Sequence, residues 1–256
     1  MTVLLLCAVA AGASALTFLS GFGLGTLLLP AFALFYPLDQ AVASTAVVHF
    51  LNGLFKLGLV GRHANRTVVL KFGLPAIAAA LLGAWTLEQL AGATALRRYQ
   101  LIGIEAELTG AKLVIGLLLL GFTALELVPR FKALSFPSRW LQLGGALSGF
   151  FGGLSGLQGA LRSAFLIRAG LTKDAYVGTG VVIACMIDFG RLAVYVPSMA
   201  RQPSLDYGVL AAAVLAAFAG SWLGNRYLKK TTLRSVQRLV AIMLLVFATG
   251  LFLGLL

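Results

Sequence analysis

The sequence predicts an all-α polytopic membrane protein of two homologous, inverted repeats, each a broken helical hairpin followed by three transmembrane helices. Three observations predict it: an apolar composition, an internal duplication, and opposite charge bias in equivalent loops of the two halves. Of the 256 residues, 60% are hydrophobic and 11% are charged, and the mean hydropathy is +0.97. Soluble globular proteins carry about 25% charged residues, so the composition excludes that class.

Ten apolar segments follow one another along the chain, separated by short polar gaps. They are 2–19, 24–36, 40–60, 67–90, 108–127, 139–153, 159–170, 174–197, 206–224 and 234–255. A membrane-spanning helix needs about 20 apolar residues, so 24–36, 139–153 and 159–170 are better explained as re-entrant or half helices. Segment 2–19 has no basic region before it, and we expect a retained membrane helix there instead of a cleaved signal peptide.

The two halves of the chain share short strings in the same order at nearly constant separation. The matching pairs are Thr94–Gln100 with Thr231–Gln237, Gly83–Trp85 with Gly220–Trp222, Thr45–Val48 with Thr179–Val182, and Gly21–Gly25 with Gly156–Ala160. Self-similarity of this kind indicates a repeat architecture. The predicted organisation is a first membrane repeat at 1–128, a basic connector at 129–138 and a second membrane repeat at 139–256.

Charge in the gaps predicts that the repeats face opposite ways. The gap after segment 40–60 carries an excess of cations, whereas Arg201 and Asp206 balance in its counterpart. In the last gap of each repeat the bias is reversed, with basic residues Arg226, Lys229, Lys230 and Arg234 in the second repeat against Arg97, Arg98, Glu105 and Glu107 in the first. Cytoplasmic loops carry the excess of Lys and Arg, which favours inverted repeats with both termini outside the cytoplasm. Eight simple spans in two parallel units of four remain the alternative.

Two glycine-rich breaks occur at matching positions of the repeats. They centre on Gly21, Gly23 and Gly25 in the first repeat and on Gly156 and Gly159 in the second. Backbone without helical hydrogen bonds survives at membrane depth only beside protein or a watery cavity, so re-entrant breaks point to a binding site. Close packing of small residues between helices is the alternative.

The second break also carries polar side chains that suit an anion. Gln158, Arg162 and Ser163 lie within an apolar segment, where an arginine costs about 2.5–3.5 kcal/mol on insertion scales. The guanidinium fork matches a pair of sulfonate, carboxylate or phosphate oxygens. We therefore predict that Arg162 binds an anion; an arginine that snorkels to the membrane surface is the alternative.

Further polar residues recur along two predicted membrane helices. His49, Asn52 and Lys56 are spaced three and four apart, which places them on one helical face, and Asp188 and Arg191 are three apart in the duplicated segment. Lys56, Asn52 and Arg191 are candidate substrate ligands. His49 and Asp188 are candidate proton-coupling groups, because imidazole changes charge near neutral pH. A hydrogen-bonded structural histidine and mutual neutralisation of Asp188 by Arg191 are the alternatives.

The sequence gives no sign of metal, cofactor or nucleic-acid chemistry. The two histidines lack a nearby cysteine or carboxylate cluster, and the glycines at Gly21 to Gly25 lack the strand and lysine of a phosphate-binding loop. The net charge of +12 lies in gaps between apolar segments, as the positive-inside rule predicts for a membrane protein. The expected partners are therefore a small anion and the lipid bilayer, with a homo-oligomer left open.

Two apolar stretches of sequence that contain several polar residues resemble those of a known family. Gly152–Phe165 and Thr45–Lys56, with the duplicated layout and the glycine break that ends at Pro30, resemble the sulfite exporter TauE/SafE transporters. The resemblance covers essentially the whole chain. It implies movement of sulfite or small organosulfonates across the bacterial inner membrane, coupled to protons. An anion channel and a membrane-embedded lipid-phosphate enzyme are the alternatives to a non-enzymatic secondary transporter.

Overall fold

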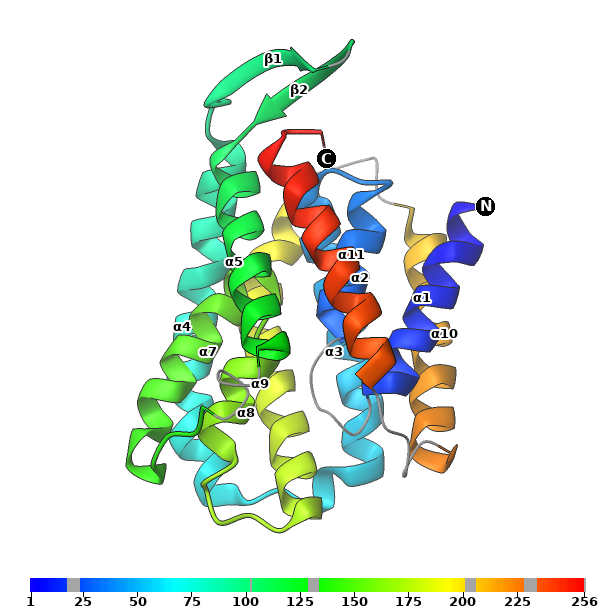
Figure 1. The fold of residues 1–256 in the computed structure, drawn as a ribbon. Helices are drawn as coiled ribbons and strands as arrows, with labels where there is room; N and C mark the ends of the chain where they lie inside the picture. Colours follow the sequence, from blue (N-terminus) through cyan, green and yellow to red (C-terminus); the bar gives the residue numbers. More distant parts are fainter. Residues whose placement is uncertain (18–23, 102, 129–133, 201–205, 228–233, 256) are drawn as a thin grey trace.

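The protein is a bundle of helices with a short β-hairpin at one end (Figure 1). The computed structural model describes residues 1–17, 24–101, 103–128, 134–200, 206–227 and 234–255, without the side chains of 101, 104, 126, 127, 227 and 234–240. The glycines Gly21 and Gly23 of the first predicted break lie outside the described residues.

The elements follow the predicted order of segments closely. In the first half they are α1 (Thr2–Thr17), α2 (Leu24–Ala33), α3 (Leu38–Val60), the 3-10 helix η1 (Gly61–His63), α4 (Arg66–Gly92), β1 (Arg97–Leu101), β2 (Ile104–Leu108) and α5 (Gly110–Leu127). In the second half they are the 3-10 helix η2 (Ser138–Trp140), α7 (Leu141–Ser155), α8 (Gly159–Leu166), α9 (Lys173–Ala200), α10 (Tyr207–Tyr227) and α11 (Arg234–Phe252).

Length and composition confirm an all-α polytopic membrane protein. Among the described residues, four helices are long and apolar enough to cross a bilayer, namely Leu38–His63, Arg66–Gly92, Lys173–Ala200 and Tyr207–Arg226. The remaining apolar helices are shorter where their side chains are described: Thr2–Leu16, Leu24–Ala33, Gly110–Leu125 and Ala241–Phe252.

The β-hairpin departs from the all-helical prediction. Strands β1 and β2 pair antiparallel around Gly103, whose φ of 78° suits glycine in a tight turn. Arg98 faces Glu107 across the hairpin, and its Nη2 lies 3.2 Å from the Glu107 Oε1. The gap in which the charges balance is therefore a folded ribbon in which opposite charges pair across the strands.

The two helical hairpins point in opposite directions along the bundle (Figure 1). Helices α1 and α2 have their outer ends at the end of the bundle where the β-hairpin lies, whereas α7 and α8 have theirs toward the opposite end. Gly156, at a φ of 79°, ends α7 in the left-handed conformation, and α8 begins three residues later. Both termini lie at the β-hairpin end of the molecule.

Glycines allow two helix pairs between the halves to approach very closely. A Cβ at Gly145, Gly149 or Gly153 of α7 would overlap backbone carbonyl oxygens of α4. In the same way, a Cβ at Gly220 or Gly224 of α10 would overlap carbonyl oxygens of α1. These contacts fix α7 against α4 and α10 against α1, because only glycine leaves room for such backbone approach. Helices α3 and α9 pack on each other and carry the site.

Candidate functional site

A buried polar cluster occupies the region where α3, α9 and the break between α7 and α8 meet. At its centre is Asp188 of α9, whose side chain is 0% exposed. Its Oδ2 lies 2.5 Å from the Nδ1 of His49 on α3. Its Oδ1 accepts hydrogen bonds from Arg191 Nε at 3.0 Å and from Gln158 Nε2 at 3.2 Å. Between them, the two carboxylate oxygens therefore contact side chains from three segments, namely α3, α9 itself and the break before α8.

Gln158 extends the cluster onto α8. It occupies the residue just before α8, and its Oε1 accepts a hydrogen bond from Arg162 Nη1 at 3.0 Å. Because Gln158 and Arg162 are four residues apart, they lie on one helical face. Its own carbonyl oxygen accepts from the Ser148 hydroxyl at 3.1 Å, which holds the break in place. The amide of Gln158 thus links Asp188 to Arg162.

Arg191 connects the carboxylate to the glycine break. Its Nη2 lies 2.7 Å from Asp188 Oδ1, and its Nη1 has no hydrogen-bond partner among the described residues. A Cβ at Gly156 would lie 2.7 Å from that Nη1, so the guanidinium lies directly against the break. A Cβ at Gly25 of α2 would lie 3.2 Å from the Gly156 carbonyl oxygen and 3.9 Å from the His49 ring. The start of α2 therefore meets the second break beside His49.

Positive charge outweighs negative charge in the buried interior. Among the described residues, the buried charged side chains are Lys56 (8% exposed), Arg162 (4%), Arg191 (0%) and Asp188 (0%). Three cations thus accompany one carboxylate away from water. The buried charged side chains are therefore net positive, and a net positive potential in a buried site attracts an anionic ligand.

The buried cations are distributed along the bundle. Gly53 of α3 packs on Cys185 of α9, because a Cβ there would lie 2.8 Å from the cysteine sulfur. Lys56 is about one turn nearer to η1 than Gly53, and Arg162 Nε faces Gly180 of α9. Lys56 and Arg162 therefore lie toward the η1 end, whereas Arg191 lies on the β-hairpin side of Asp188.

Two predicted ligands are not joined to the cluster. Asn52 donates to Ser14 Oγ at 2.9 Å and accepts from Ser221 Oγ at 2.8 Å, and the two hydroxyls are 2.6 Å apart. This closed triangle ties α3 to α1 and α10, and its buried hydroxyls have partners within it. Ser163 is one residue beyond Arg162, so its side chain leaves the helix about 100° further round. The described hydrogen bonds do not include the Ser163 hydroxyl.

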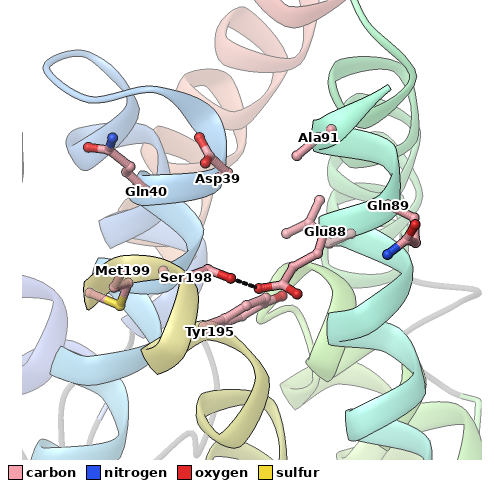
Figure 2. A pocket seen from close by; sticks show the side chains of 11 residues that line it. Asp39, Gln40, Glu88, Gln89, Ala91, Tyr195, Ser198 and Met199 are labelled. Atoms are coloured by element: carbon pink, nitrogen blue, oxygen red, sulfur yellow. Dashed lines mark hydrogen bonds between the residues drawn. The ribbon is translucent and has the colours of Figure 1, made fainter. Parts of the chain in front are cut away.

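A cavity of about 440 Å³ opens at the β-hairpin end, and sequence reasoning missed it. It is lined by Asp39, Gln40 and Ala43 of α3, Leu87, Glu88, Gln89, Ala91 and Gly92 of α4, and Tyr195, Ser198 and Met199 of α9. Figure 2 shows Glu88 bonded to the Ser198 hydroxyl, with Asp39 and Gln40 on the other wall. The sequence does contain a signal for this cavity. Asp188, Arg191, Tyr195 and Ser198 recur every three or four residues along α9, which places them on one helical face.

Comparison with known families matches residues 4–251 to the family described as Sulfite exporter TauE/SafE. The chain belongs to this family. A comparison with curated proteins finds no match. As a TauE/SafE protein, the chain is a membrane protein of a transporter family, and the buried cluster lies inside the matched region. Among the described residues, no group of three or more His, Cys, Asp or Glu could hold a metal ion.

Proposed function

We propose that this TauE/SafE protein is a secondary transporter that carries a small anion, sulfite or an organosulfonate, across the bacterial inner membrane as a multi-pass protein. The observation that carries the proposal is the excess of buried cations, with Lys56, Arg162 and Arg191 against Asp188. A bound anion with two negative charges would balance this excess of two, and one with a single charge would halve it. Full burial of Asp188 also favours a transporter over a lipid-phosphate enzyme, which needs a cleft open to lipid.

The anion would bind between Arg162 and Arg191, beside the break at Gly156. Guanidinium groups present forked donors that match the oxygens of sulfite or a sulfonate. The first N–H groups of α8 lie at the same break, and a helix N-terminus favours negative charge. Lys56 would add a compact positive charge on the η1 side.

His49 and Asp188 would carry the coupling proton. A carboxylate in contact with a histidine side chain can share a proton with it, and imidazole serves as a proton carrier in many proteins. Asp188 also contacts Arg191 and, through Gln158, Arg162. Protonation of the pair would therefore change the field felt by an anion bound to these arginines.

We further propose that the two halves are inverted repeats. The opposite directions of the α1–α2 and α7–α8 hairpins support this, and so does the reciprocal packing of α1 on α10 and of α7 on α4. Within the described residues, the exposed cations Arg62, Arg66, Lys71, Arg168 and Lys173 belong to the end opposite the β-hairpin. The positive-inside rule then makes that end cytoplasmic.

Uptake of labelled anions into vesicles tests the function. Purified protein in liposomes should exchange [³⁵S]sulfite or a labelled sulfonate such as sulfoacetate, and unlabelled sulfite should compete. Phosphate and chloride serve as controls for unselective anion passage. Because protonation of the His49–Asp188 pair would make the site more positive, uptake should be faster when the compartment that supplies the anion is the more acidic one. Equal passage of chloride would support a channel, and protein-free rates for every anion would contradict the proposal.

Cysteine labelling tests the orientation. In a background with Cys7 and Cys185 replaced by serine, Thr2→Cys and Leu255→Cys should react with a membrane-impermeant maleimide added to intact cells. Lys173→Cys, at the opposite end, should react only after permeabilisation. The reverse pattern would contradict the proposed orientation, and labelling of Thr2→Cys and Leu255→Cys from opposite sides would contradict the inverted arrangement.

A further inference from the structure

The cavity at the β-hairpin end has a charge character opposite to that of the buried cluster. Two carboxylates, Asp39 and Glu88, line it, and among the residues that the structure describes its lining contains no lysine, arginine or histidine. The remaining polar groups of the lining are amides, a hydroxyl and a phenol. An anion in this cavity would therefore be repelled, whereas an anion in the cluster would be attracted.

The cavity and the cluster are neighbours along α9. Ser198 and Tyr195 line the cavity, and Arg191 is one turn further along the same helix, next to Asp188. The Tyr195 side chain is 3% exposed, and its hydroxyl donates to the Gly153 carbonyl oxygen at 2.5 Å. Gly153 is three residues before Gly156, against which Arg191 packs. Tyr195 therefore separates the floor of the cavity from the anion-attracting side chains.

The charged side chains are distributed asymmetrically between the two ends of the bundle. Lys56 and Arg162 lie on the η1 side of Asp188, and exposed cations surround that end. On the other side of Asp188 come Arg191 and Tyr195, and then the cavity lined by Glu88 and Asp39. Opposite charges raise the local concentration of an anion at one end, and like charges lower it at the other.

We propose that the cavity is the vestibule into which the anion is released, and that Glu88 and Asp39 lower the affinity of this face for the anion. The inference rests on the proposed function, since it assumes that an anion passes the buried cluster. These carboxylates would disfavour rebinding of released anion at the β-hairpin face, so that movement driven from the η1 end by a gradient would be less inhibited by the anion already released. Glu88 and Asp39 would then determine the asymmetry of transport without touching the anion in its central site.

The charge of the cavity can be measured independently of transport. Ala91 lines the cavity and is exposed, so Ala91→Cys, in a background lacking Cys7 and Cys185, provides one reactive thiol there. Its reaction rates with methanethiosulfonate reagents bearing a trimethylammonium or a sulfonate group report the local potential. Relative to free cysteine, the cationic reagent should be favoured by about tenfold or more at low salt, and less at high salt.

Removing the carboxylates should remove this preference. Glu88→Gln keeps the size of the side chain and a group that can bond Ser198, and Asp39→Asn is the second variant. Each should lower the reagent preference about threefold to tenfold at low salt. Glu107→Gln, which removes an exposed carboxylate from the β-hairpin, is the matched control and should leave the preference unchanged. An unchanged preference in both cavity variants would overturn the proposal, whatever the transport results.

A transport measurement then links the potential to asymmetry. With [³⁵S]sulfite supplied at the β-hairpin face, Glu88→Gln should lower the half-saturating concentration several-fold, with little change when sulfite is supplied at the other face. Equal effects at both faces, or loss of transport in both directions, would overturn the proposal. Absence of sulfite exchange by the unmodified protein, with the reagent preference intact, would instead count against the proposed function.

Discussion

Asp188→Asn is expected to abolish anion transport and to lower the free energy of unfolding by about 3–5 kcal/mol, the usual effect of removing one partner from a buried ion pair. Asp188 is the one carboxylate among the buried charged side chains of the described residues, and it contacts His49, Gln158 and Arg191. An asparagine would leave the Arg191 charge buried without its counterion. Thermal unfolding in detergent and [³⁵S]sulfite uptake measure the two effects.

His49→Gln separates the coupling role of the pair from its structural role. Glutamine can still bond Asp188, and the Asp188–Arg191 contact is untouched, so the variant should fold and bind the anion. Because it has no imidazole to carry a proton, its transport should lose its dependence on a pH gradient. If its pH dependence were unchanged, His49 would be a structural residue. A stable, fully active Asp188→Asn would contradict the central role of the carboxylate.

Replacement of Arg162 should weaken anion binding with little effect on folding. Arg162→Lys keeps the charge but loses the forked donors, and hydrogen bonds to charged groups contribute roughly 1.5–3 kcal/mol. We expect the Kd to rise about 10-fold to 150-fold in Arg162→Lys, since 1.4 kcal/mol corresponds to a factor of ten. Arg162→Gln, which also loses the charge, should bind more weakly still. Equilibrium binding of [³⁵S]sulfite to purified protein measures both.

Arg168 provides the matched control for Arg162. It is an exposed arginine six residues further along, just beyond the end of α8. Arg168→Gln removes the same charge from the same segment and should leave the affinity unchanged. An arginine that only snorkels would predict equal and small effects at the two positions. Wild-type affinity in both Arg162 variants would therefore remove Arg162 from the site.

The sequence predicted best those parts of the fold for which a bilayer permits few structures. Apolar segments of about 20 residues have to be helical in a bilayer, so the main helices were predictable from hydropathy. An arginine and an aspartate inside such segments need partners, which is why Arg162, Arg191 and Asp188 stood out. The position of Gly156 followed from its glycine-rich surroundings, because a left-handed residue ends a helix most readily at glycine.

Other features depend on contacts that one sequence does not specify. His49 and Asp188 are 139 residues apart, and no periodicity in either helix predicts that their side chains meet. Asn52 shares a helical face with His49 and Lys56, yet its partners Ser14 and Ser221 come from α1 and α10, which only the tertiary packing brings to it. The β-hairpin could have been found, because Ile104, Ala106 and Leu108 alternate with glutamates in the period of a strand.

The close glycine contacts have a consequence for how the molecule can move. Helix α7 packs closely on α4, and α1 packs closely on α10. The first long helix of each half therefore packs against a helix of the other half. The mechanical units are therefore exchanged pairs that do not coincide with the two stretches of sequence. Any rocking that alternately uncovers the cluster would carry α4 together with α7, and α1 together with α10. The surface between the moving pairs would then lie along α3 and α9, which hold all the buried charged side chains of the described residues except Arg162 on α8.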